Sequence, residues 1–162
     1  MTYLNEFEIE DGLNLEEFFR QKISSFEILR TKGQRPYAVK FTNVKSGVVV
    51  VKCVPRDFCD LEDVGVLKFV KNTPQLSDDS VVDNYTIDKC VIHNEIGKLK
   101  RIVTLAGNEY INVGIFLEFP SSLPIIILGG DMPYTIAIVG WSRGGLDGLS
   151  EFPWSEYCIV NW

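Results

Sequence analysis

Several features that a catalytic or cofactor-binding sequence would carry are missing from this chain of 162 residues. It has a single histidine, His93, and its four cysteines form no C-x-x-C pair, so the usual ligand spacings of a closed zinc site are absent. It also lacks the glycine-rich phosphate loop of nucleotide-binding proteins and the G-x-G-x-x-G dinucleotide fingerprint. We therefore predict no metal and no cofactor, and a binding protein rather than an enzyme.

The chain also lacks the pattern of a secretory signal and an apolar run long enough for a membrane span. Residues 1–11 contain four acids and no basic residue, whereas a secretory signal starts with basic residues and continues as an apolar run. The most apolar stretch, 123–141, is interrupted by prolines, glycines and an aspartate, although a span needs about 20 apolar residues. These patterns predict a cytoplasmic protein with reduced, mostly buried cysteines.

Basic residues are outnumbered, 16 Lys and Arg against 22 Asp and Glu, for a net charge of −6. A nucleic acid or an anionic membrane is therefore not expected as a partner. The acids are concentrated in blocks, with nine acids against three basic residues in 57–97 and five against one in 111–162. Such blocks are either solvated faces or an acidic surface that meets a basic protein.

The hydrophobic spacing predicts two helices. One starts near Leu15, after Asn14 as its N-cap, and the other follows the apolar stripe of residues 61–70, with Asp57 or Asp60 as its cap. Runs of β-branched and aromatic residues predict strands at 37–42, 48–54, 85–93, 99–105, 110–119, 125–128, 134–139 and 157–160. We therefore expect one α+β domain over 1–162, with a mostly antiparallel sheet of about seven to nine strands and about two helices.

One short motif suggests catalysis. Gly140-Trp141-Ser142-Arg143-Gly144 follows an apolar run and resembles the nucleophile elbow of the α/β-hydrolases, which implies a serine nucleophile followed by an acid and a histidine. No histidine follows Ser142, and the next residues contain Gly and Pro where that family has a helix. We expect a glycine-rich loop here and no catalytic residue.

The best candidates for a binding site are two loops. All three tryptophans fall in the last 22 residues, and Trp, Tyr and Arg are enriched at binding hot spots; the alternative is that the tryptophans seal one end of the sheet. The predicted partner-binding residues are Asp78, Asp79, Asp83, Trp141, Arg143, Asp147, Glu151 and Trp154. An exposed sheet edge that receives a partner strand is another possible binding mode.

The chain as a whole is small and acidic, and no set of residues in it is typical of a catalytic site. In these respects it resembles the small acidic immunity proteins that bacteria pair with secreted toxins. The resemblance implies tight binding to a basic toxin domain, such as a nuclease, whose phosphate-binding surface an acidic inhibitor can occupy. Two alternatives remain: a small-ligand-binding domain or small enzyme with an apolar pocket under the sheet, and a subunit of a larger assembly. A closed cavity would favour ligand binding, whereas a filled core and a broad acidic face would favour the inhibitor.

Overall fold

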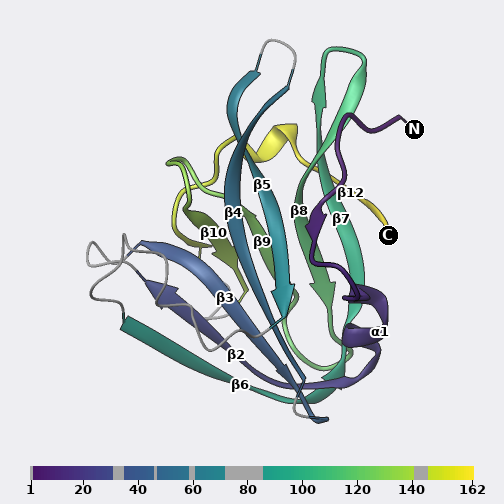
Figure 1. The fold of residues 1–162 in the computed structure, drawn as a ribbon. Coiled ribbons are helices and arrows are strands. Elements are labelled where there is room, and N and C mark those ends of the chain that lie inside the picture. Colours follow the sequence, from purple (N-terminus) through teal and green to yellow (C-terminus); the bar gives the residue numbers. More distant parts are fainter. Residues whose placement is uncertain (1, 31–34, 46, 59–60, 72–85, 141–145) are drawn as a thin grey trace.

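The computed structural model describes residues 2–30, 35–45, 47–58, 61–71, 86–140 and 146–162, which form two six-stranded sheets (Figure 1). The first sheet has the order β1-β5-β4-β3-β2-β6, with β1 Glu8–Ile9, β2 Lys22–Arg30, β3 Pro36–Asn43, β4 Val48–Phe58, β5 Leu61–Lys71 and β6 Thr86–Ile96. The second has the order β11-β10-β9-β8-β7-β12, with β7 Lys98–Ala106, β8 Glu109–Glu118, β9 Ile125–Gly129, β10 Ile136–Val139, β11 Leu146–Asp147 and β12 Cys158–Asn161. Within the sheets, β1 and β5 are parallel and the other neighbours are antiparallel.

The β-rich, mostly antiparallel part of the prediction is confirmed, but the two expected helices are not both present. The described helices are α1, Leu15–Arg20, and a single 3-10 turn, Trp154–Glu156. Helix α1 begins where predicted, because the side chain of Asn14 accepts a hydrogen bond from the backbone N–H of Glu17 at 3.1 Å. No helix in the described ranges is both long and apolar enough to cross a membrane.

The second expected helix is wrong, because residues 61–71 form β5 and pair with β4 along their length. Val64, Val66 and Leu67 are all nearly inaccessible, so both faces of this strand are covered. Burial on both faces removes the alternation of apolar and polar residues that marks a half-exposed strand. The apolar residues at every third position of 61–70 therefore resembled the stripe of a helix. As a result, the fold has more strands and less helix than the expected α+β domain.

The two sheets pack face to face around a filled core (Figure 1). Phe41, Phe69 and Val51 of the first sheet share one apolar cluster with Ile115 and Ile127 of the second, all at most 1% exposed. Helix α1 adds its own aromatic side chain to this cluster, since Phe19 meets Phe41 edge to face at 5.3 Å between ring centroids. Each such side chain stabilises the fold by about 1.5–3 kcal/mol on burial.

One strand passes from the first sheet into the second. β6 ends at Ile96, Gly97 forms the corner, and β7 begins at Lys98, so the chain turns upward from the lower edge in Figure 1. A Cβ on Gly97 would lie 3.2 Å from the ring of Phe119. Close packing at this corner therefore favours glycine, as expected where a strand switches sheets.

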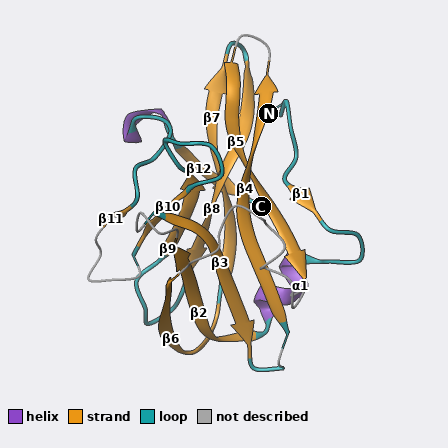
Figure 2. Cartoon of the chain, turned by 60° about the vertical axis from the view of Figure 1, so that its left-hand side comes forward, coloured by secondary structure: helices purple, strands orange, loops and turns teal. Residues whose placement is uncertain are grey.

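Two long hairpins, β4–β5 and β7–β8, project at the same end of the sandwich, uppermost in Figure 1. Phe58 and Leu61 near the tip of the first and Ala106 at the tip of the second pack on one apolar cluster. Figure 2 shows β1 at the edge of the first sheet beside β5. The N-terminal segment continues from there to the second sheet, where Leu4 donates its N–H to the carbonyl oxygen of Tyr110 at 2.8 Å.

Candidate functional site

The predicted partner-binding residues are only partly within the described structure. Asp78, Asp79, Asp83, Trp141 and Arg143 lie outside the described residues, as does Ser142 of the serine motif. Asp147 lies in β11, where its backbone pairs with Ile138 of β10. The remaining two predicted residues, Glu151 and Trp154, are described, and they differ in exposure. Trp154 is 45% exposed and its ring lies 5.7 Å from that of Tyr157.

Glu151 connects the two sheets. Its carboxylate accepts a hydrogen bond from the backbone N–H of Gly65 on β5 at 2.9 Å, and its own N–H donates to the carbonyl oxygen of Gly129 at the end of β9. The two glycines are so close that a Cβ on Gly129 would lie 3.1 Å from the carbonyl oxygen of Gly65. Burial raises the pKa of the Glu151 carboxyl; the hydrogen bond from Gly65 opposes this, and the nearby Asp63 carboxylate adds to it. Glu151 therefore has a structural role at this contact.

A buried thiol lies beside this carboxylate. Burial, together with the negative charge of Glu151, raises the pKa of Cys53 to about 12, against a weaker opposing hydrogen bond from the backbone of Gly130. A thiol in this state is a poor nucleophile at neutral pH, so it behaves as the small buried hydrophobe that the sequence predicted. Cys158 on β12, in contrast, is exposed. The described residues contain no group of three or more His, Cys, Asp or Glu side chains that could hold a metal ion.

Carboxylates gather where the long hairpins project, and we call this group the acidic end. It consists of Asp57, Glu62 and Asp63 near the tip of β4–β5, Glu109 at the start of β8, and Glu156 in the 3-10 helix. All of them are exposed except Glu109, which is half-buried. Arg56 is the one described Lys or Arg on the same hairpin tips and 3-10 turn, and it is already ion-paired with Glu8.

A hydrogen bond across the β4–β5 hairpin holds two of these acids. The carboxylate of Asp57 on β4 accepts from the backbone N–H of Asp63 on β5 at 2.9 Å, and Asp63 has φ +55°, a left-handed conformation that aspartate tolerates better than most residues. The sequence placed Asp57 at the start of a helix, but it lies near the end of strand β4. Its carboxylate is thereby joined to the neighbouring strand.

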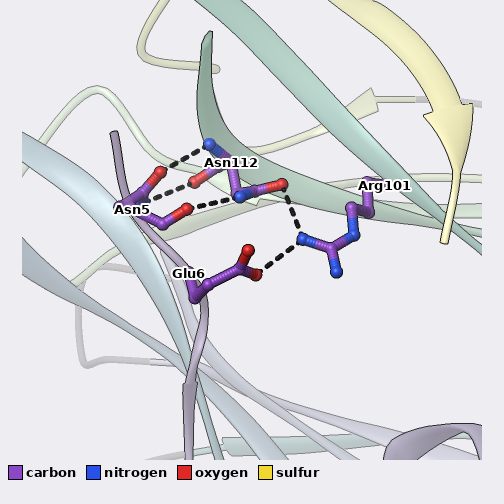
Figure 3. Close-up of polar contacts among 4 residues, drawn as sticks. All are labelled: Asn5, Glu6, Arg101 and Asn112. Atoms are coloured by element: carbon purple, nitrogen blue, oxygen red, sulfur yellow. Dashed lines mark hydrogen bonds and ion pairs between the residues drawn. The ribbon is translucent and has the colours of Figure 1, made fainter. Parts of the chain in front are cut away.

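A separate polar network attaches the N-terminal segment to β8 (Figure 3). The backbone N–H of Asn112 donates to the side-chain oxygen of Asn5 at 2.7 Å, and its side-chain amide donates to the backbone carbonyl of Asn5 at 2.6 Å. The side-chain amide of Asn5 donates in return to the carbonyl of Asn112 at 3.1 Å. Asn112 adjoins a bulge in the β7–β8 ladder, where an irregular register frees backbone groups for such bonds.

Arg101 extends this network to the C-terminal end of the described chain. Its guanidinium donates to the carboxylate of Glu6 at 2.6 Å and to the side-chain oxygen of Asn112 at 3.4 Å, as Figure 3 shows. It also lies 4.7 Å from the ring of Trp162, which stacks on Phe7 with centroids 5.4 Å apart. The rings of Trp162 and Phe7 thus surround a cation of the chain itself. Trp162 therefore packs against the end of the sheet, which is the alternative to a binding role that the sequence analysis gave for the tryptophans.

Three exposed apolar side chains lie near the predicted loop, and the sequence did not single them out. Met132, Tyr134 and Leu149 are 49%, 62% and 57% exposed. The turn 132–135 between β9 and β10 carries the first two, and the backbone N–H of Asp131 donates to the carbonyl oxygen of Leu149 at 2.8 Å. The Met-Pro-Tyr-Thr sequence between two strands signals a turn, but it does not reveal that the ring is presented to solvent.

An open groove of about 580 Å³ lies beside α1, lined in part by Phe19, Arg20, Leu99 and Trp162. It lies at the surface, outside the filled core between the sheets. An apolar pocket under the sheet, which the ligand-binding interpretation requires, would occupy the space that Phe41 and Phe69 fill. No protein-family model, curated protein or solved structure matches this chain.

Proposed function

We propose that this chain is a cytoplasmic protein-binding inhibitor of the immunity-protein kind, which neutralises a basic toxin domain, such as a nuclease, by binding to it. The observation that carries the proposal is the acidic end. It presents five carboxylates, and the one neighbouring described cation, Arg56, is already ion-paired. A projecting surface with an excess of charge of one sign steers an oppositely charged partner and orients it during encounter.

The filled core supports a binding protein over a small-ligand binder. Ligand sites usually enclose most of the ligand in a concave, mainly apolar pocket, whereas the described interior of this sandwich is occupied by its own aromatic and aliphatic side chains. A protein partner needs only a surface of about 800 Å² on each side. The two long hairpins that project from the same end of the sandwich offer such a surface.

The inhibitor would act by placing its carboxylates on the basic surface of the toxin domain and by covering that surface. A nuclease surface binds phosphates with Lys and Arg, and the carboxylates of Asp57, Glu62 and Asp63 would occupy those cations in place of phosphates. The hydrogen bond between Asp57 and Asp63 would limit the entropy lost on binding, because the Asp57 carboxylate is already held in place. The complex would form quickly at low ionic strength and more slowly as salt screens the charges.

A pull-down from the native lysate at low and at high salt, with mass spectrometry of the retained proteins, would test the proposal. We expect one basic protein at near-equal stoichiometry, with weaker capture at high salt. The purified partner would then be bound to two double variants with the same change in net charge: Glu62→Lys with Glu156→Lys at the acidic end, and Asp11→Lys with Glu17→Lys elsewhere. The first pair should slow association at low salt by about tenfold or more, and the second should change it little.

Equal slowing by both double variants would show that net charge alone matters and would contradict a contact at the acidic end. If no basic protein is retained at either salt concentration, the inhibitor proposal fails. Native mass spectrometry of the purified chain would then test for a bound small ligand.

A further inference from the structure

We propose that Met132, Tyr134 and Leu149 form the apolar anchor of the binding surface, with the ring of Tyr134 receiving an arginine side chain of the basic partner. This inference rests on the proposed function, since it names the contact that the same partner would make. Tyr, Trp and Arg dominate the energetics of protein interfaces, and their contacts cluster in a few residues rather than spreading over the surface.

The backbone of Tyr134 is the first argument. Thr135 donates its N–H to the carbonyl oxygen of Met132 at 3.1 Å, which closes a turn with Pro133 at its second position and Tyr134 at its third. Tyr134 has φ +62°, the type II turn conformation that normally requires glycine. A bulky side chain there is a true outlier, and such strain persists only where the surroundings enforce it.

The surroundings do enforce it. The hydroxyl of Thr135 donates to the carbonyl oxygen of Met132 at 2.6 Å, and the backbone N–H of Gly130 donates to the carbonyl oxygen of Thr135 at 2.8 Å. The turn is thus tied on both sides, and the Tyr134 side chain is left 62% exposed. Fold stability alone would favour glycine at this position, so the exposed ring is a candidate for a binding role.

The second argument is the charge around the anchor. The segment that carries Leu149 continues through Glu151 to Glu156 of the acidic end, so the anchor adjoins that group of carboxylates along the chain. Asp131 beside the turn is ion-paired with Arg35 at 2.7 Å, and this pair adds no net charge. An aromatic ring with flanking aliphatic side chains next to the acidic end fits an arginine, whose planar guanidinium stacks on the ring while its stem covers apolar surface.

The probe is N-acetyl-L-arginine methylamide, titrated into the ¹⁵N-labelled protein and followed by amide chemical shifts, with N-acetylglycine methylamide as the control compound. We expect saturable, millimolar shifts at residues 132–135 and 149 that the glycine compound does not cause. Tyr134→Gly should abolish these shifts while Tm stays the same or rises by about 2–4 °C, because glycine relieves the positive φ. Leu123→Gly, at an exposed apolar residue outside the turn, should leave the arginine shifts unchanged.

Shifts that spread over all exposed acids, or that persist in Tyr134→Gly, would overturn the anchor. Against the captured basic protein, Tyr134→Gly should weaken binding by about 30-fold or more, as expected for a hot spot. A partner that binds Tyr134→Gly as tightly as the wild-type protein would refute this inference and leave the proposed function standing. Localised arginine shifts in a protein that captures no basic partner would refute the proposed function and retain the anchor.

Discussion

Asn5 and Asn112 are joined by three hydrogen bonds although they are 107 positions apart in the chain. Each residue uses both side-chain and backbone groups, and Asn112 is fully buried. The pair therefore fixes the N-terminal segment to β8 while satisfying the polar groups of the buried Asn112. Its contribution to stability can be measured directly.

Replacement of Asn112 by Ala should lower the free energy of unfolding by about 2–3 kcal/mol, because it removes, at a fully buried position, the amide that donates to the carbonyl of Asn5 and the oxygen that accepts from Arg101. Urea denaturation would give the value. Asn161→Ala, at an exposed position of β12, is the matched control and should change stability by no more than about 0.5 kcal/mol. Similar losses in the two variants would mean that the network contributes little.

The pH dependence of stability should report on Glu151. Its pKa in the folded protein lies above the ordinary value of 4.5, so the folded state holds the proton more tightly than the unfolded chain. The resulting stabilisation is complete below pH 4.5 and is lost as the pH rises through the folded pKa. Glu151→Gln keeps an acceptor for the Gly65 N–H but does not titrate, so its stability relative to the wild-type protein should increase over this window.

Unfolding free energies of both proteins between pH 4 and pH 8 would provide the comparison. Glu151→Ala serves as the contrasting variant, because it removes the acceptor and should cost about 1–3 kcal/mol. A constant difference between the wild-type protein and Glu151→Gln over the whole range would contradict the raised pKa.

Thiol reactivity should separate Cys53 from Cys158. In the folded protein at pH 7.5, iodoacetamide should modify Cys158 at least about 100-fold faster than Cys53, because Cys53 is buried and its pKa is about 12. Peptide mass spectrometry resolves the two sites, and labelling in urea, where both should react, is the internal control. Comparable rates in the folded state would show that Cys53 is accessible.

Trp162 and Trp154 should differ in how much each contributes to the free energy of unfolding. Trp162→Ala should cost about 2 kcal/mol, since the ring stacks on Phe7 and faces the guanidinium of Arg101. Trp154→Ala should cost less than about 1 kcal/mol, because its side chain is largely exposed. Thermal and urea unfolding of both variants would test this order, and a larger loss for Trp154 would reverse the assigned roles.

Local sequence signals predicted the local structure well. Asn14 caps α1, and the expected strands from 37–42 to 157–160 all coincide with strands of the two sheets. The error at residues 61–71 arose because burial depends on what covers each face of a strand, which is not encoded locally. The second sheet lies against one face of β5, and only the tertiary fold shows why apolar residues stand next to one another there.

The candidate site was less predictable for a related reason. Composition singled out Glu151, but its partner Gly65 lies 86 residues earlier, and no local pattern connects them. The acids at 57–63 were visible in the sequence, yet their place on a projecting hairpin depended on β5 being a strand. Tyr134 was missed because a positive φ at a non-glycine residue cannot be inferred from a Pro-Tyr pair alone.

The cage around Arg101 also has a kinetic consequence. Tyr3, Phe7 and Trp162 come from opposite ends of the described chain, so closing the cage requires the intervening strands to be in place. Contacts of such long sequence separation make folding slow, and we expect this cage to form after the rate-limiting step. Substitutions in it should then accelerate unfolding and leave the refolding rate nearly unchanged, so the cage would determine how long the folded molecule lasts more than how quickly it forms.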